Sequence, residues 1–235
     1  MHSKDEGGSM TTTLGSSVEQ LMTRLTGDEK HSHAATSTLD VLRVLYDRVL
    51  RHRPERPDDP GRDRFFLSKG HGPMAYYAVL ASHGYFPADW LDDFGSFDSP
   101  LGHHPDRNLV PGVEISSGSL GHGLPLAVGA ALGLRIQRSD ARVFVLVGDA
   151  ELDEGSNHEA IEYAAAAGLD NLTVIAVDNH SSSYAVRGRM AERFAVNGWH
   201  AVTVDGRDHA DIERALRHVT PQIPTAVIAR VEDKS

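Results

Sequence analysis

Short, continuous aliphatic runs alternate with helix-forming segments along the second half of the chain. The runs are RVFVLVG at 142–148, NLTVIAV at 171–177, WHAVTV at 199–204 and TAVIARV at 225–231. Apolar runs of this length are typical of strands that are buried on both faces, which occur in parallel sheets joined by crossover helices. The pattern predicts an α/β fold with a parallel sheet flanked by helices on both faces.

Helical periodicity and helix-ending residues locate the segments between these runs. Upstream, RFFL at 64–67 reads as a short strand leading into a glycine turn. Residues 94–119 are rich in Gly, Pro, Ser and Asp, which is long for a connection without structure and is typical of a functional loop. The expected helices begin at Ser37, Met74 and Pro87, and later cover 121–138, 155–167, 189–197 and 208–218.

The length of 235 residues suits one substantial domain better than two. Residues 1–17 are polar and rich in Gly and Ser, so we expect a flexible segment there and a single domain over 18–235. Residues 1–17 lack the apolar core of a secretory signal, which favours the cytoplasm. The longest apolar stretch, 124–134, is too short to span a bilayer.

Charge and composition exclude several classes of function. The formal net charge of −10 repels nucleic acid and anionic membranes, so neither is expected as a partner, and an anionic ligand would need a local basic site. The absence of cysteine excludes disulfides, thiolate catalysis and Cys-ligated zinc.

Two of the predicted strands end in polar residues that suit a metal. The strand at 142–148 runs into Asp149, and the strand at 171–177 runs into Asp178 and Asn179. Parallel strands end at the same edge of a sheet, where ligands bind. A carboxylate and an amide oxygen, together with a backbone carbonyl and diphosphate oxygens, would complete an oxygen shell for Mg²⁺. Taken alone, Gly148-Asp149 favours a simple turn in which Asp149 caps a helix, and only the second motif at Asn179 shifts the interpretation to a metal site.

Several motifs in order identify a family resemblance. GDAELDEGSNHEA, followed 30 residues after Asp149 by Asn179 in VDNHS, resembles the thiamine diphosphate signature of transketolases. The resemblance extends through DRFFLSKGHGPMAYYAVLASHGYF and LGHHPDRNLVPGVEISSGSLGHGLPLAVGAALG, and more weakly through KHSHAATSTLDVLRVLY. The chain thus resembles the N-terminal, diphosphate-binding half of a transketolase.

The resemblance implies thiamine diphosphate as cofactor, held through Mg²⁺ or Ca²⁺. The metal ligands would be Asp149, Asn179 and the carbonyl of Ser181. Ala150 stands where the family usually has Gly, which we expect to be tolerated at negative φ. The implied cofactor-binding residues are His71, Gly118, Ser119, Leu120, Gly148, Asp149, Ala150, Glu154 and Asn179.

The same resemblance assigns catalytic histidines. His31, His71 and His104 would face the substrate or the diphosphate, and imidazoles suit proton transfer near neutral pH. The position of His31 depends on the register of the helix that follows it. Glu154 would be a buried acid near a subunit interface.

In the transketolase family a two-carbon ketol unit passes from a ketose to an aldose, and a glutamate in a separate pyrimidine-binding domain activates the cofactor. We expect no such domain within these 235 residues. The resemblance therefore implies a split enzyme with a C-terminal partner subunit, in an α2β2 assembly that acts on sugars or sugar phosphates.

Three alternatives stay open at this point. One is a different thiamine diphosphate chemistry, of the 2-oxo acid dehydrogenase or deoxyxylulose-phosphate synthase type, against which SKGH and SGSLGHG count. Another is a non-catalytic relative that binds a partner, against which the retention of both Asp149 and Asn179 counts. The third is a metal site without thiamine, built from His31, His33, His103 and His104.

Overall fold

The structure is a computed structural model that describes residues 17–25, 36–184 and 186–232. The polar segment 1–17, apart from Ser17, and the predicted catalytic residue His31 lie outside these described residues. Within them, no helix has both the length and the apolar character needed to cross a membrane.

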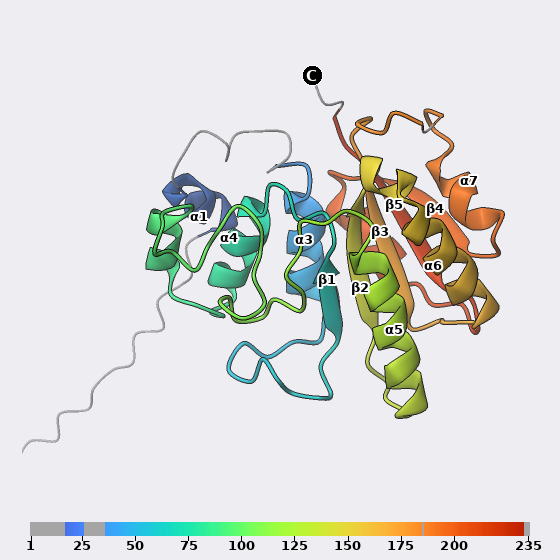
Figure 1. Ribbon diagram of the computed structural model, residues 1–235, viewed down its shortest axis with the longest axis horizontal. Coiled ribbons are helices and arrows are strands. Elements are labelled where there is room, and N and C mark those ends of the chain that lie inside the picture. The colour runs from blue at the N-terminus through green and yellow to red at the C-terminus, as the bar shows by residue number, and fades with distance from the viewer. Residues whose placement is uncertain (1–16, 26–35, 185, 233–235) are drawn as a thin grey trace, which may run out of the picture.

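The centre of the molecule is a five-stranded sheet in which every pairing is parallel (Figure 1). The predicted parallel α/β fold is therefore confirmed. The strands lie in the order β1-β2-β3-β5-β4, and their bounds are β1 Arg64–Leu67, β2 Val143–Gly148, β3 Leu172–Asp178, β4 His200–Asp205 and β5 Thr225–Arg230.

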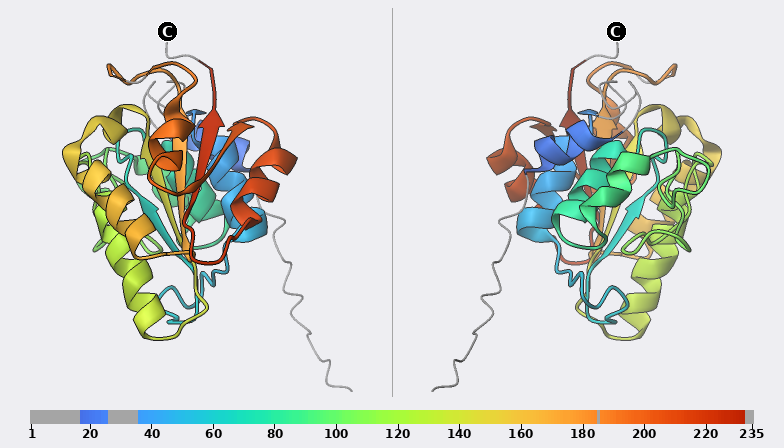
Figure 2. Two further views of the ribbon diagram at one scale, coloured as in Figure 1. Left: turned by 90° about the vertical axis from the view of Figure 1, so that its right-hand side faces the viewer. Right: turned by 90° about the vertical axis from the view of Figure 1, so that its left-hand side faces the viewer.

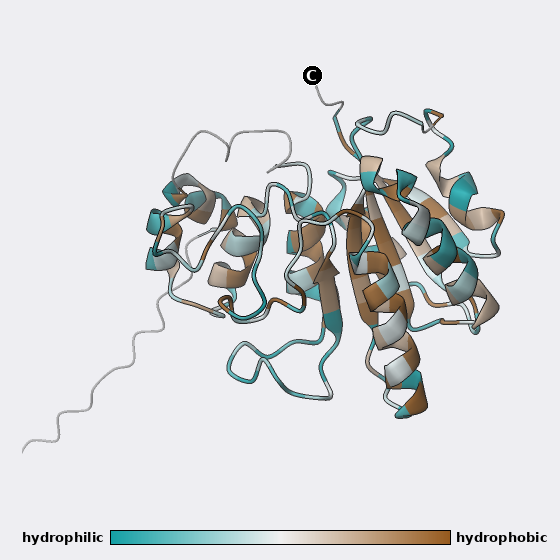
Figure 3. Cartoon of the chain, in the orientation of Figure 1, coloured by the Kyte–Doolittle hydropathy of each residue, from teal (hydrophilic) through white to brown (hydrophobic). Residues whose placement is uncertain are grey.

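Alternate residues of each strand enter two different hydrophobic clusters, because successive side chains point to opposite faces of a sheet. In β2, Phe144 and Leu146 join the cluster that contains Leu42 and Leu80, whereas Val145 and its neighbours join the other cluster. Figure 3 shows the strands as the most apolar part of the chain. Burial on both faces explains why β2, β3 and β5 read as continuous aliphatic runs, whereas β4 at the edge of the sheet is only partly buried.

Helices cover both faces of the sheet, as Figures 1 and 2 show. The first face carries α1 Val18–Arg24, α3 Leu39–Val44, α4 Met74–Ser82 and α8 His209–Arg217. The second face carries α5 Gly123–Ile136, α6 Gly155–Ala166 and α7 Met190–Ala195. Shorter helical turns are the π-helical η2 Leu45–Val49 and the 3-10 turns η3 Ala88–Asp93 and η4 Ala150–Asp153.

The direction in which the chain adds strands to the sheet reverses after β4. The chain crosses from β3 past the position of β5 to reach β4, and then returns to insert β5 between them. The helix of the outward crossing, α7, lies on one face, and the helix of the return, α8, lies on the other. This exchange of faces is what right-handed crossovers require when the direction of travel reverses.

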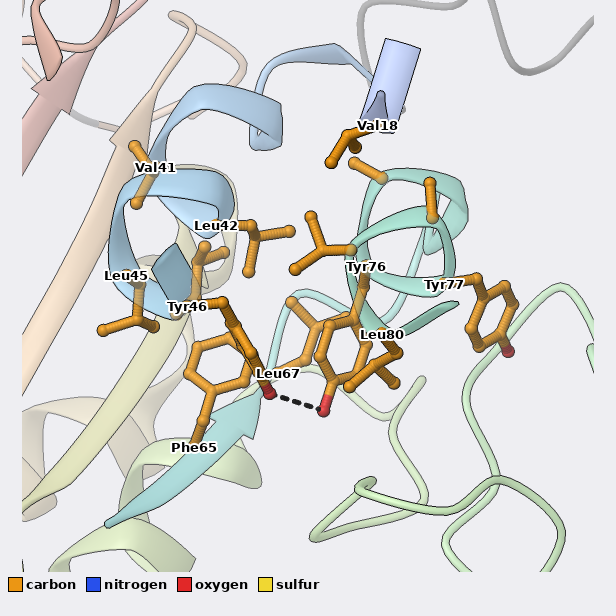
Figure 4. Close-up of a cluster of buried hydrophobic side chains, with 14 of the residues drawn as sticks. Val18, Val41, Leu42, Leu45, Tyr46, Phe65, Leu67, Tyr76, Tyr77 and Leu80 are labelled. Atoms are coloured by element: carbon orange, nitrogen blue, oxygen red, sulfur yellow. Dashed lines mark hydrogen bonds between the residues drawn. The ribbon is translucent and has the colours of Figure 1, made fainter. Parts of the chain in front are cut away.

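The long loop after η3 is fixed to the core by two tyrosines of α4. Tyr76 and Tyr77 are buried, and their hydroxyls donate to the carbonyls of Gly112 at 3.2 Å and Gly102 at 2.9 Å. Tyr76 also packs edge-on against Phe65 of β1, and its hydroxyl lies 3.4 Å from that of Tyr46 (Figure 4). A loop that contains no regular element is thus held against α4 at two points.

Candidate functional site

The ends of β2 and β3 bring Asp149 and Asn179 to the same edge of the sheet. Gly148, the last residue of β2, is paired with Val177 of β3, so the next residues along both strands emerge side by side. The side chains belong to residues that are only 1% and 5% exposed, respectively. A cavity of about 230 Å³ lies here, lined by Asp149, Asp178, His180, Ser182, Val186, Arg187 and Met190.

The carboxylate of Asp149 is held by the loop that follows β3. It accepts hydrogen bonds from the backbone N–H of Ser181 at 2.6 Å and of Ser182 at 3.1 Å, and from the hydroxyl of Ser181. It also accepts from the N–H of Ala150 at 2.8 Å and so caps the turn η4. The capping alternative is therefore part of the structure, but most of the donors to this carboxylate come from the neighbouring strand end.

Asn179 provides an acceptor that the protein leaves without a donor. Its Oδ1 is buried, and none of the described residues donates a hydrogen bond to it. An amide oxygen in that state carries a desolvation cost, which a bound cation would offset. Together with the carboxylate of Asp149 it is a hard oxygen pair of the kind that Mg²⁺ or Ca²⁺ binds, so these residues fit the implied metal.

The described residues do not complete a metal shell by themselves. Among them, no group of three or more His, Asp or Glu side chains is arranged to hold an ion. His103 and His104 also diverge: the ring of His103 lies 5.4 Å from that of Phe94, whereas His104 faces His71. The positions of His103 and His104 therefore do not support a metal site built from histidines alone. The other two histidines of that alternative, His31 and His33, lie outside the described residues. The missing oxygens would have to come from a ligand such as a diphosphate.

A lysine that was not singled out from the sequence lies beside this edge. The aliphatic part of Lys69 runs along Gly148, where a Cβ atom would meet Lys69 Cδ at 3.5 Å. Its ammonium group donates to the carbonyl of His71 at 3.1 Å. In a chain of net charge −10, Lys69 thus provides a local positive charge at the strand end. Its place in the SKGH motif, shortly after β1, is the sequence feature that could have identified it.

The predicted ring-contacting segment lies on the exposed side of the same region. His104 packs on Gly118, which has φ +135° and has room for no side chain, because a Cβ would lie 2.9 Å from the imidazole. The rings of His71 and His104 are 6.2 Å apart and both residues are exposed. Ser119 is also exposed, and Leu120 retains 46% of its surface. The structure thus gathers the predicted residues His71, His104 and Gly118 to Leu120.

The acidic residues in the turn η4 and directly after it differ in burial and in hydrogen bonding. Glu151 is buried, and burial raises the pKa of its carboxyl group. Asp153 accepts hydrogen bonds from Ser182 and Arg193, which outweigh its partial burial and lower its pKa. Glu154 is exposed in the single chain and precedes α6, with its Cβ beside Gly121. Its burial at an interface stays a prediction.

Ala150, the departure from the usual glycine, has an ordinary backbone. Within the described residues the non-glycine positions with positive φ are Arg138, His180 and Gln222, and Ala150 is not among them. The condition for tolerating its methyl group is therefore met.

A parallel sheet with Asp149 and Asn179 at its carboxyl edge has the architecture of the class of α/β proteins whose ligand sites lie beyond the strand ends. Comparison with known families narrows this class. The family described as "Transketolase, thiamine diphosphate binding domain" matches residues 23–231, and the chain belongs to this family. The resemblance seen in the sequence motifs is thereby confirmed.

The similar proteins include transketolases and one protein with a different name. The chain is 53% identical to a protein named ferredoxin fas2 from Rhodococcoides fascians over 216 residues, which cover 92% of this chain and 71% of that protein. It is 47% identical to one subunit of the apulose-4-phosphate transketolase from Actinobacillus succinogenes over 145 residues, covering 62% of this chain and about half, 52%, of the relative. The solved transketolase from Leishmania mexicana superposes with a TM-score of 0.73 at 27% identity, covering 88% of this chain and 37% of that one.

Proposed function

We propose that the chain is the cofactor-binding subunit of a two-chain transketolase that transfers a two-carbon ketol unit from a ketose or ketose phosphate to an aldose. The observation that carries this proposal is the pair formed by the buried carboxylate of Asp149 and the partnerless Oδ1 of Asn179, in a chain of this family. The pair suits a divalent metal that still needs oxygens from a diphosphate.

Asp149 and Asn179 would hold Mg²⁺ or Ca²⁺, with the carbonyl of Ser181 as a third protein ligand. Gly148 and Ala150 would offer backbone N–H groups to the diphosphate, and His71 would lie beside it. Lys69 lies along Gly148 and would offset part of the negative charge of the diphosphate. Gly118, Ser119 and Leu120 would contact the rings of the cofactor.

Bound thiamine diphosphate would supply the electron sink for breaking the carbon–carbon bond. The protein's own contribution is to orient the sugar and to move protons at its oxygens. His104 and His71 are exposed and adjacent, so their ring nitrogens can donate to or accept from substrate hydroxyls. His31 is proposed for the same role on the basis of the family resemblance.

The partner is proposed to be a C-terminal transketolase subunit with the pyrimidine-binding domain and the activating glutamate, in an α2β2 assembly. Two observations support a partner. Leu120 and Glu154 are exposed in the single chain although both are predicted site residues. The relative from Actinobacillus succinogenes is also named as one subunit of a transketolase for apulose 4-phosphate.

Calorimetric titration with thiamine diphosphate tests this function. It would be done with Mg²⁺ and with EDTA, on the wild type and on Asp149→Ala, each with and without the partner chain. We expect binding that requires Mg²⁺ and Asp149, followed by ketol transfer from a ketose phosphate in the two-chain complex. A stable complex of both chains that binds no cofactor would instead identify a non-catalytic relative. Release of CO₂ from a 2-oxo acid without ketol transfer from a sugar would identify the other thiamine diphosphate chemistries.

A further inference from the structure

Glu151 is a buried carboxylate for which the proposed reaction has no use. It is 1% exposed, and burial raises the pKa of its carboxyl group. Its Oε1 accepts from the N–H of Gly121 at 3.0 Å and from the hydroxyl of Ser68, and its Oε2 lies 3.3 Å from the N–H of Gly148. A buried acid with this many donors must serve to hold the groups that donate to it, because burying it has a cost.

The three donors come from three separate parts of the chain. Ser68 follows β1, Gly121 belongs to the loop that leads into α5, and Gly148 ends β2. Glu151 is therefore a single acceptor at the junction of the SKGH turn, the SGSLGHG loop and the strand end that carries Asp149.

The packing around this junction is too tight for the loop to shift freely. Ser68 also accepts from the N–H of Gly123 at 3.0 Å, and a Cβ at Gly123 would lie 2.3 Å from Ser68 Cβ. On the other side, the hydroxyl of Ser156 donates to the carbonyl of Gly121 at 2.8 Å. The segment from Gly118 to Leu120 lies directly before these contacts, so its position follows from them.

We propose that Glu151 is a positioning residue that fixes the Gly118–Gly121 segment relative to the end of β2. This inference rests on the proposed function. In that function, Glu151 sets the distance between the Gly118–Leu120 segment, which would contact the cofactor rings, and the site for the diphosphate. Both carboxylate oxygens are needed, since one holds the loop and the turn and the other faces the strand end. A glutamine at this position keeps one acceptor but directs its NH₂ group toward another N–H donor.

The test compares two ligands of the full chain in complex with its partner chain. Thiamine diphosphate occupies both parts of the site, whereas inorganic pyrophosphate, measured with Mg²⁺ as a competitor, occupies only the diphosphate part. For Glu151→Ala we expect thiamine diphosphate to bind about 30-fold more weakly while pyrophosphate changes by less than about threefold. Glu151→Gln should lose about three- to tenfold for the cofactor, because it keeps the acceptor for Gly121 and Ser68.

Ser68→Ala removes one donor from the same junction and should weaken thiamine diphosphate about fivefold, again with little change for pyrophosphate. It serves as the second variant if Glu151→Ala does not fold. Glu55→Gln is the control for Glu151→Gln, because it replaces an exposed glutamate in the same way. It should leave the affinities for thiamine diphosphate and for pyrophosphate unaltered.

Equal losses for both ligands would overturn the positioning role, since they would show general damage to the fold. Unchanged cofactor affinity in Glu151→Ala would overturn it as well. If the wild-type complex fails to bind thiamine diphosphate, or if pyrophosphate does not compete with it, the proposed function itself fails. The wild-type measurements therefore separate the two failures.

Discussion

The candidate site has two halves that are held in different ways. The strand-end half, Asp149 and Asn179, is buried and is placed by the pairing of β2 with β3. The loop half, His104 and Gly118 to Leu120, is exposed and is placed by hydrogen bonds to side chains, including Glu151 and the tyrosines of α4.

This difference separates what the sheet can supply from what it cannot. Strand pairing fixes backbone positions along the whole edge, so two residues that are 30 positions apart in the sequence, Asp149 and Asn179, become neighbours. A loop without regular structure has no such ladder and needs a dedicated partner for each segment. Substitutions in the loop half should therefore leave the strand-end half largely intact, whereas substitutions in the strand-end half should have larger effects. The following predictions test this difference.

The largest effect is expected for Asp149→Ala. Cofactor affinity in the presence of Mg²⁺ should fall about 100-fold or more, because a metal ligand is lost. The free energy of unfolding should also drop by about 1–3 kcal/mol, since the N–H groups of Ser181 and Ser182 lose their acceptor. Calorimetry and urea denaturation measure the two effects, with exposed Asp98→Asn as control. Full affinity in Asp149→Ala would remove this residue from the metal site.

Asn179→Ala should separate ligand binding from stability. Its Oδ1 has no hydrogen-bond partner to lose, so the free energy of unfolding without ligand should change by less than about 1 kcal/mol. Cofactor affinity with Mg²⁺ should nevertheless fall about 10- to 100-fold. Titration with Mg²⁺ at fixed cofactor provides the measurement. A large loss of stability with unchanged affinity would mean that Asn179 is structural.

Gly121→Ala perturbs the loop half directly. Gly121 has φ +82°, and a Cβ would lie 2.5 Å from Ser156 Oγ. We expect the free energy of unfolding to fall by about 1–3 kcal/mol and cofactor affinity to fall about tenfold, with the Mg²⁺ requirement retained. Gly129→Ala in α5 is the matched control, because a Cβ there meets nothing within 4 Å. It should raise the stability of the single chain by about 0.5–1 kcal/mol, and an equal loss in both variants would refute the steric explanation.

The acid that joins the two halves should give the stability a characteristic pH dependence. Burial raises the pKa of Glu151 above the ordinary value of 4.5, so the folded protein binds the proton more tightly than the unfolded chain does. The stability from this group is fully present below that ordinary value and is lost as the pH rises through the folded-state pKa. On going from acid to neutral pH, the unfolding free energy of the wild type should therefore fall relative to that of Glu151→Gln. A constant difference in denaturation midpoints across this range would contradict the raised pKa.

The smallest effect is expected for Ala150→Gly. The φ angle of Ala150 is not positive, so restoring the glycine that is usual in the family relieves no strain. Cofactor affinity should change by less than about threefold, and the free energy of unfolding should fall by about 0.5–1 kcal/mol through the added freedom of glycine. Calorimetry and denaturation check both numbers. A tenfold gain in affinity would show that the methyl group obstructs the diphosphate.

The sequence was most informative where one physical signal decides the structure. The five strands were predicted to within a residue or two, and for β2, β3 and β5 the reason is that a strand buried on both faces has to be a continuous apolar run. The same signal placed Asp149 and Asn179 at one edge, since the parallel arrangement follows from the alternation with helices. Their carboxylate and amide oxygens indicated a metal site, and the family motif added thiamine diphosphate as the proposed cofactor.

The loop half could not be predicted at the same level. Its path depends on contacts between distant residues, such as Tyr76 with Gly112, which no local pattern indicates. The acids of η4 show the same problem. Glu151 lies within the 3-10 turn and points inward, whereas Glu154 has φ −70° and ψ 133° and leaves the turn to begin α6. The sequence ELDEG contains both acids, and only the geometry of this turn shows which one is buried.

The reversal of strand order has a consequence for the synthesis of the protein on the ribosome. β5 is the last of the five strands in the sequence, yet it lies between β3 and β4 and pairs with both of them. Val231, which follows β5, donates its N–H to the carbonyl of Asp178, the residue before Asn179. The sheet edge that carries Asp149 and Asn179 therefore cannot be completed before β5 has been translated, and until then one side of β3 stays unpaired. A ribosome stalled before residue 225 would hold a nascent chain with an unpaired, aggregation-prone strand edge.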